Sequence, residues 1–310
     1  MRNVNGNDGA GARPALDGTR AAPWTAGSQP ALLPVPSLAT DCHIHIYDAR
    51  FPYDPGAQLQ PGAATVSDYR LLQARLGTER CVAVQPSSYG TDNACLVDAL
   101  SQFGADARGV AVVDASVSDE QLRALDAAGV RGARFNLARP GGTMMEALET
   151  VARRVAPLGW HLQLHTLADL WTGLEATMRR LPVPLVIDHL GRLPQPAGLL
   201  HPAWPVLRRL VDEGRAWVKI SGAYHDTRTG APDYADTGAV VKAWVEAAPE
   251  RVVWGTDWPH PSATAGEKPV PDDARLLDLL GEWVPSEALR HRILVDNPAL
   301  LYRFETEART

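Results

Sequence analysis

Cysteine is scarce in this sequence of 310 residues, which contains only Cys42, Cys81 and Cys95. Their spacing matches no disulfide framework and no metal-binding motif, so a disulfide-rich secreted scaffold is excluded and a reducing, cytoplasmic compartment is favoured. Long apolar runs are also missing, since none approaches the ~20 residues that cross a bilayer. Residues 1–37 contain no continuous apolar segment of the kind found in secretory signals. We therefore expect neither a membrane partner nor secretion.

Positive charge is not in excess. Lys and Arg number 30 against 36 Asp and Glu, which gives a formal net charge of −6. A chain with this balance offers no basic surface, so nucleic acid is not an expected partner. A glycine-rich phosphate turn after an early strand is also missing, which argues against a doubly wound nucleotide-binding sheet.

Short apolar segments recur from residue 38 onward at intervals of roughly 25–30 residues, with amphipathic stretches between them. One such stretch follows Ser118, a predicted helix N-cap, and ends before Gly129, a predicted stop. Strand, helix and strand in this order form right-handed parallel connections, and eight such units close into a barrel. The predicted strands cover residues 42–47, 81–85, 110–114, 132–136, 162–166, 185–190, 217–221 and 252–257.

The predicted fold is therefore α/β: a single-domain (β/α)8 TIM barrel over residues 38–310, with extra C-terminal helices at 286–294 and 297–304. Residues 1–37 are predicted to form a flexible N-terminal arm. They are rich in Gly, Pro, Ala, Asn and Ser, and such a segment buries too little surface to offset its ordering entropy. From about Trp24 the arm is expected to lie against the domain or a neighbouring subunit, so a homo-oligomer is compatible with it.

Polar residues gather at the carboxyl ends of the predicted strands, where barrels of this kind carry their active sites. His43 and His45 are two residues apart on the first strand, so their side chains face the same way. Cys42 lies between them and is expected to point away, as a packed thiol. Asp257 stands at the matching end of the last strand. This arrangement is typical of an enzyme.

Four motifs resemble those of the amidohydrolase superfamily: Asp-Cys-His-Ile-His at 41–45, Ile-Asp-His-Leu-Gly-Arg at 187–192, Trp-Gly-Thr-Asp-Trp-Pro-His at 254–260 and Asp-Asn-Pro-Ala at 296–299. Three further segments, 51–53, 86–93 and 131–136, are similar to the lactonase branch of that superfamily, which includes 2-pyrone-4,6-dicarboxylate lactonase. The resemblance spans about residues 38–304. It is carried by the order and spacing of the motifs together.

The resemblance implies hydrolysis of a ring ester, with Asp257 as the general base. A carboxylate within hydrogen-bond reach of a water can take its proton as the water attacks the lactone carbonyl. His43, His45 and His189 would polarise that carbonyl and stabilise the developing oxyanion. These four residues form the predicted catalytic set.

Metal dependence stays open in the sequence. His43, His45, His165 and Asp257 could form a three-imidazole, one-carboxylate set of the kind that Zn²⁺ accepts. Members of the superfamily that this chain resembles also need, for two metals, a bridging carboxylate or modified lysine on the fourth strand, where this sequence has Arg134, so the resemblance implies no binuclear centre. The lactonase branch also includes enzymes that work without metal. His165 is therefore either a ligand of one divalent ion or a hydrogen-bonding contact to substrate.

Cationic side chains near the strand ends indicate a small anionic lactone as substrate, because guanidinium groups bind carboxylates through paired hydrogen bonds. The residues expected to bind it are Ser87, Tyr89, Arg134, Asn136, Arg139, Arg192, Ser221, Tyr224, Trp258 and His260.

The leading hypothesis is a lactonase acting on a pyrone dicarboxylate, a muconolactone or a sugar-acid lactone, as in aromatic or sugar-acid catabolism. A zinc-dependent decarboxylase and a lactone isomerase are alternatives on the same barrel. A non-catalytic organic-acid binding protein is a further alternative, although pure binding requires no base. Fold alone does not decide among these substrates.

Overall fold

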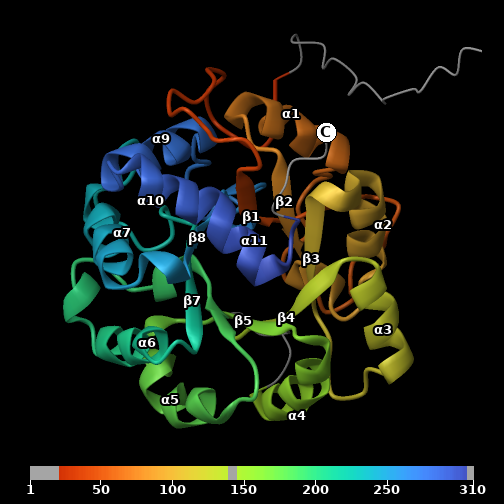
Figure 1. Ribbon diagram of the computed structural model, residues 1–310. Helices are drawn as coiled ribbons and strands as arrows, with labels where there is room; N and C mark the ends of the chain where they lie inside the picture. Colours follow the sequence, from red (N-terminus) through yellow and green to blue (C-terminus); the bar gives the residue numbers. More distant parts are fainter. Residues whose placement is uncertain (1–20, 139–144, 306–310) are drawn as a thin grey trace, which may run out of the picture.

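The computed structural model describes residues 21–138 and 145–305, and within them eight parallel strands follow one another around a ring in sequence order (Figure 1). Parallel neighbours with a helix between them are the expected product of repeated strand–helix units. The strands are β1 (Thr40–Ile44), β2 (Arg80–Val84), β3 (Ala107–Ala111), β4 (Val130–Asn136), β5 (His161–His165), β6 (Leu185–Ile187), β7 (Ala216–Ile220) and β8 (Val252–Trp254).

The ring closes between its first and last strands. The amide of His45 donates to the carbonyl of Trp258 at 2.8 Å, and the amide of Asp257 donates to the carbonyl of His43 at 2.8 Å. A parallel bridge joins Ile44 to Trp258 at the same place. The closure therefore sets Asp257 directly beside the histidine pair, and the predicted barrel is confirmed.

Helices surround the strands (Figure 1). Ser118 caps one of them as predicted, because its hydroxyl accepts from the amide of Gln121, and Gly129 follows the helix with φ +100°. The helices are α1 (Val66–Leu76), α2 (Ala94–Phe103), α3 (Asp119–Ala127), α4 (Met145–Val155), α5 (Trp171–Arg180), α6 (Ala203–Asp212), α7 (Ala235–Ala247), α8 (Pro261–Thr264), α9 (Asp273–Trp283), α10 (Glu287–His291) and α11 (Asn297–Tyr302).

The amino ends of the strands are covered by the C-terminal segment. In Figure 1, α11 crosses the centre of the strand ring. Tyr302 and Phe304 pack with Cys42, Val82 and Val110 in a cluster separate from the main helix–strand core. Cys42 is therefore a packed thiol, as predicted, but it lies in this cluster and not in the layer between strands and helices, so its predicted direction is wrong. The register between β1 and β2 shifts within this segment, so strict alternation does not hold along β1.

Residues 21–37 make defined contacts with the barrel. Trp24 Nε1 donates to the carbonyl of Ala63 at 2.8 Å, and Trp258 Nε1 donates to the carbonyl of Pro23 at 2.9 Å. The amide of Leu33 donates to Asp278 on α9. The earlier part of the predicted arm, residues 1–20, lies outside the described residues.

Within residues 21–138 and 145–305, no helix is both long enough and apolar enough to span a membrane.

Candidate active site

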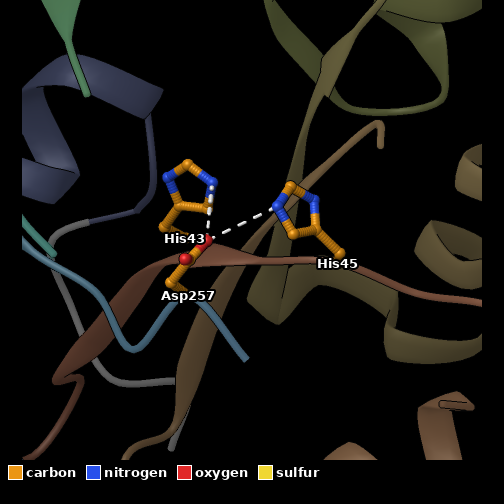
Figure 2. A group of neighbouring side chains, drawn as sticks. All are labelled: His43, His45 and Asp257. Carbon is orange, nitrogen blue, oxygen red and sulfur yellow. Dashed lines mark ion pairs between the residues drawn. The ribbon is translucent and has the colours of Figure 1, made fainter. Parts of the chain in front are cut away.

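The centre of the candidate site is the carboxylate of Asp257 between two imidazoles (Figure 2). Its Oδ1 lies 3.5 Å from Nε2 of His43 and 3.5 Å from Nε2 of His45. A third imidazole, that of His189, places its Nε2 4.0 Å from the same oxygen. All four side chains are at most 3% exposed. The predicted catalytic set thus converges on one carboxylate oxygen.

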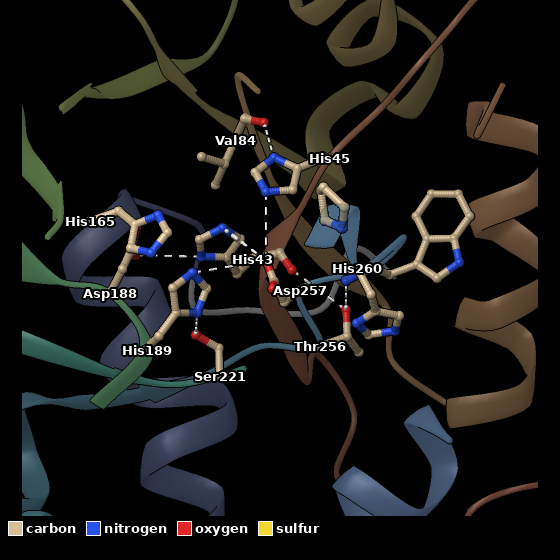
Figure 3. A network of polar contacts seen from close by, with 12 residues as sticks. His43, His45, Val84, His165, Asp188, His189, Ser221, Thr256, Asp257 and His260 are labelled. Atoms are coloured by element: carbon tan, nitrogen blue, oxygen red, sulfur yellow. Dashed lines mark hydrogen bonds and ion pairs between the residues drawn. The ribbon is translucent and has the colours of Figure 1, made fainter. Parts of the chain in front are cut away.

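The other carboxylate oxygen is held by neighbours from the loop after β7. The phenol of Tyr224 donates to Oδ2 of Asp257 at 2.5 Å, and Nε2 of His225 lies 3.2 Å from it. Ser221, on the same loop, contacts Nδ1 of His189 at 2.9 Å (Figure 3). Tyr224 and Ser221, predicted to bind substrate, therefore contact Asp257 and His189 of the predicted catalytic set.

Two of these residues have unusual backbone conformations. Asp257 has φ +71° and His189 has φ +49°, both in the left-handed region that non-glycine residues rarely adopt. Such conformations cost of order 1–3 kcal/mol each and persist only where the surroundings enforce them. For Asp257, the hydrogen bond from its own amide to the carbonyl of His43 provides part of that enforcement. Local strain is concentrated where the side chains converge.

A buried network of charges lies beneath the site. Lys219 is 0% exposed, and its Nζ donates to the carbonyl of Cys42 at 2.8 Å and to Oε1 of Gln163 at 2.7 Å. Gln163 in turn donates to Oδ2 of Asp188 at 3.0 Å. The other oxygen of Asp188 lies 3.7 Å from Nζ of Lys219 and 3.4 Å from Nδ1 of His43. Through Asp188, this network contacts the imidazole of His43 and helps to hold it in place.

Burial and these charges set the protonation states. Burial and the nearby Lys219 ammonium lower the pKa of His43 to about 3, so its imidazole is neutral. Burial alone would raise the pKa of Asp257, but the nearby His189 and the contact with His225 outweigh it and hold that pKa well below its usual range. Burial and the adjacent Asp257 raise the pKa of Tyr224, so its phenol remains a donor. Asp257 is therefore an ionised carboxylate.

The donor set fits a cation. His45 donates from Nδ1 to the carbonyl of Val84 at 2.7 Å, so its Nε2 carries a lone pair that faces Oδ1 of Asp257 (Figure 3). Two acceptors face to face require a proton or a metal ion between them. Nε2 of His43 also points to this place and is buried without a hydrogen-bond partner among the described residues. A ring nitrogen fixed by a backbone carbonyl is the usual arrangement for a metal-binding histidine.

His165 lies apart from this donor set. Within the described residues, the groups that could hold a metal ion are His43, His45 and Asp257; His43, Asp188 and His189; and His189, His225 and Asp257. His165 is in none of them. Its Nε2 instead lies 2.8 Å from Nη1 of Arg192, and Arg192 pairs with Asp226 at 2.7 Å. The structure thus separates His165 from the predicted set of ligands, and turns Arg192 toward Asp226 and His165.

A pocket opens above Asp257 at the carboxyl ends of the strands. Arg134 lines it and is anchored by donating from Nη1 to the carbonyl of Gln85 at 3.2 Å. Asn136 and Ser87 line it together, joined by a 2.8 Å hydrogen bond. Tyr47 also forms part of the wall. Three of the predicted substrate contacts, Arg134, Asn136 and Ser87, therefore face the place where a ligand would bind.

Other predicted contacts lie elsewhere. The indole of Trp258 is 0% exposed and packs against Tyr69 at 5.5 Å, outside the strand ring. His260 binds Asp273 at 3.1 Å and supports the ring of Tyr224 edge-on. Tyr89 is buried, and its hydroxyl accepts from the amide of Asp48. None of these three lines the pocket, and Arg139 is outside the described residues.

Two residues that contact the predicted catalytic set were not assigned a role from the sequence. His225 follows β7 in the same short loop as Tyr224, and Asp188 directly precedes His189, so position after a strand was their signal. Lys219 is also part of this buried group, through Asp188. A lysine inside an otherwise apolar strand is rarely fully buried unless it is paired.

Comparison with known proteins agrees with this geometry. A family model described as Amidohydrolase matches residues 40–304. The chain belongs to the amidohydrolase family. This amidohydrolase is 36% identical over 282 residues to 4-sulfomuconolactone hydrolase of Rhizobium radiobacter, covering 89% of this chain and 94% of the relative.

Two further relatives carry other names. The chain is 34% identical to 2-pyrone-4,6-dicarboxylate hydrolase of Comamonas testosteroni, with 90% of this chain and 94% of the relative covered. It is also 34% identical to D-galactarolactone isomerase of Agrobacterium fabrum, with 86% and 92% covered. A crystal structure from Agrobacterium tumefaciens matches with a TM-score of 0.81 at 32% identity, covering 88% of this chain and 98% of that one. The resemblance to the lactonase branch is confirmed.

Proposed function

We propose that this amidohydrolase hydrolyses a small lactone that carries an anionic substituent, with Asp257 as the general base. The observation that carries the proposal is the asymmetry of one carboxylate. Tyr224 and His225 hold Oδ2, while Oδ1 faces three imidazoles below a pocket lined by Arg134. An ionised, oriented carboxylate beside such a pocket is suited to take a proton from water.

The reaction follows from these positions. Asp257 takes a proton from a water molecule as the water oxygen bonds to the lactone carbonyl carbon. His189 contacts the hydroxyl of Ser221 through Nδ1, so its Nε2–H can donate to the developing oxyanion. The tetrahedral intermediate then loses the ring oxygen, which takes the proton back from Asp257. The products balance as one hydroxy acid, or its keto tautomer, per lactone and water consumed.

Arg134 supports an anionic substrate. Its side chain is 5% exposed, and its nearest carboxylate, Asp188, lies 3.9 Å from Nε while also contacting Lys219 and Gln163. Because Asp188 is shared with Lys219, it does not fully neutralise the guanidinium of Arg134. That guanidinium can therefore still attract a carboxylate or sulfonate in the pocket. Relatives named for a sulfomuconolactone and a pyrone dicarboxylate are consistent with that substrate class.

Isomerisation is the second candidate, favoured by the similarity to D-galactarolactone isomerase. The same carboxylate would take a proton from a substrate hydroxyl instead of from water, and that hydroxyl would become the new ester oxygen. The two reactions differ in their balance, because only hydrolysis consumes water and releases an acid.

A panel of lactones separates these candidates. We expect turnover of 2-pyrone-4,6-dicarboxylate, a sulfomuconolactone or a sugar-acid lactone, with one acid equivalent released in a pH-stat and one ¹⁸O atom incorporated from labelled water. An uncharged lactone of the same ring size serves as the control and should react roughly 10–100-fold less efficiently, since it lacks the ionic contact to Arg134. Ring migration without acid release would favour the isomerase. No turnover of any member would refute both.

We further propose that His43, His45 and Asp257 hold one divalent ion, and that the ion is Zn²⁺, which prefers imidazole and carboxylate ligands. When bound, such an ion acts as a Lewis acid toward a carbonyl oxygen. Elemental analysis of protein purified without added metal should give about one zinc per chain. His45→Ala should reduce that content, whereas the buried but remote His161→Ala should not. Full activity in metal-free protein would contradict the assignment.

A further inference from the structure

Arg192 is held in a single orientation beside the pocket. Its Nε and Nη2 donate to the two carboxylate oxygens of Asp226 at 2.7 and 3.2 Å, and its Nη1 lies 2.8 Å from Nε2 of His165. Arg192 follows Leu190 and Gly191 in a turn with positive φ, with φ +56° at Arg192 itself. The guanidinium is therefore committed to two partners, one of which is an imidazole at the end of β5.

The chemistry of this contact fixes the tautomer of His165. A guanidinium has only donors and does not lose its proton in proteins, so the 2.8 Å contact requires a lone pair on Nε2. The proton of the neutral imidazole must then be on Nδ1. Burial and the nearby charges of Arg134 and Arg192 lower the pKa of His165 well below its usual value, in agreement with a neutral ring.

This tautomer leaves one donor without a partner. Nδ1 of His165 is buried and has no hydrogen-bond partner among the described residues. The ring lines the same pocket as Arg134 and Asn136, and packs edge-on against His189 with centroids 4.8 Å apart (Figure 3). A buried donor that stays unpaired costs ~1–3 kcal/mol, whereas an acceptor oxygen brought by a ligand removes that cost.

We infer that His165 binds the substrate by donating from Nδ1 to one of its acceptor oxygens, and that Arg192 is the positioning residue that enforces this. The inference rests on the proposed lactone substrate and adds a specific contact to it. It also decides between the two roles that the sequence leaves open for His165. With Nε2 occupied by Arg192 and Nδ1 protonated, the ring has no lone pair left for a metal ion.

Two substitutions at His165 test the contact. Asparagine places an amide near the position of Nδ1, whereas glutamine places one near Nε2. We expect His165→Gln to keep the partner of Arg192 and to raise KM roughly 10–100-fold, with a smaller change in kcat, because it removes a donor to substrate. His165→Asn should retain much more of the wild-type KM. Metal content should be unchanged in both, and loss of metal in both, or equal effects on KM, would overturn the inference.

The tautomer can be measured without any turnover. Nitrogen-15 NMR of the imidazoles in the full-length protein, with His165 assigned by the spectrum of His165→Gln, should show Nδ1–H and a bare Nε2. Arg192→Met removes the enforcing donor, so a mixture with the Nε2–H tautomer is expected, whereas Arg192→Lys should preserve Nδ1–H. An Nε2–H tautomer or an imidazolium in the wild type would refute the inference. The NMR spectrum does not depend on the substrate. A wrong tautomer would therefore refute this inference alone, whereas an absence of turnover in the lactone panel would refute the proposed function.

Discussion

Asp257→Asn should lower kcat by about 10²–10⁴-fold, the range that general-base catalysis typically contributes. The amide has nearly the shape of the carboxylate and can still accept from Tyr224, which now donates at 2.5 Å. It cannot take a proton from water. The backbone hydrogen bond from residue 257 to the carbonyl of His43 does not involve the side chain, so the barrel closure should persist.

The measurement is steady-state turnover of the best lactone from the panel, together with thermal unfolding of the same preparation. Asp278→Asn is the matched control. The carboxylate of Asp278 accepts from the amides of Leu32 and Leu33, and Asp278 does not line the pocket. That control should leave kcat unchanged. Wild-type turnover in Asp257→Asn would show that another group is the base.

Lys219→Met should lower the free energy of unfolding by about 3–5 kcal/mol, as expected when one partner of a buried charge network is removed. The ammonium is fully buried and lies 3.7 Å from Asp188, while it donates to Gln163 and to the carbonyl of Cys42. Methionine fills a similar volume but leaves the carboxylate of Asp188 with less compensation. Those contacts also lie below His43, so catalysis should fall as well.

Denaturant unfolding measures this effect. Lys242→Met on the exposed side of α7 is the control and should change the free energy of unfolding by less than about 0.5 kcal/mol. The double variant Lys219→Met/Asp188→Asn should recover part of the lost stability, because it removes the uncompensated charge. If the double variant is no more stable than Lys219→Met, the loss comes from packing and the electrostatic account is wrong.

Much of the site could be predicted because strand geometry is local. His43, His45 and Asp257 lie at the ends of strands whose order follows from the repeated pattern, so their meeting required only the closure of the barrel. The common direction of His43 and His45 follows from their spacing of two residues along the chain.

The errors occur where that regularity ends. β8 stops at Trp254, and positive φ values at Asp257 and His260 turn the following chain, so side-chain alternation cannot be extended to Trp258. On β1, the register shift similarly redirects Cys42. The pairing of Arg192 with Asp226 and His165 joins the end of β5 to the segments that follow β6 and β7, and only a three-dimensional structure provides these distances.

The closure of the barrel between β1 and β8 has a consequence for biosynthesis. His43 and His45 belong to the beginning of the barrel and Asp257 follows its last strand, so a chain emerging from the ribosome cannot assemble this site until residue 257 has been made and β8 has docked. A chain that ends before residue 257 therefore lacks the proposed base. Appearance of activity during translation would report the moment at which the final strand docks.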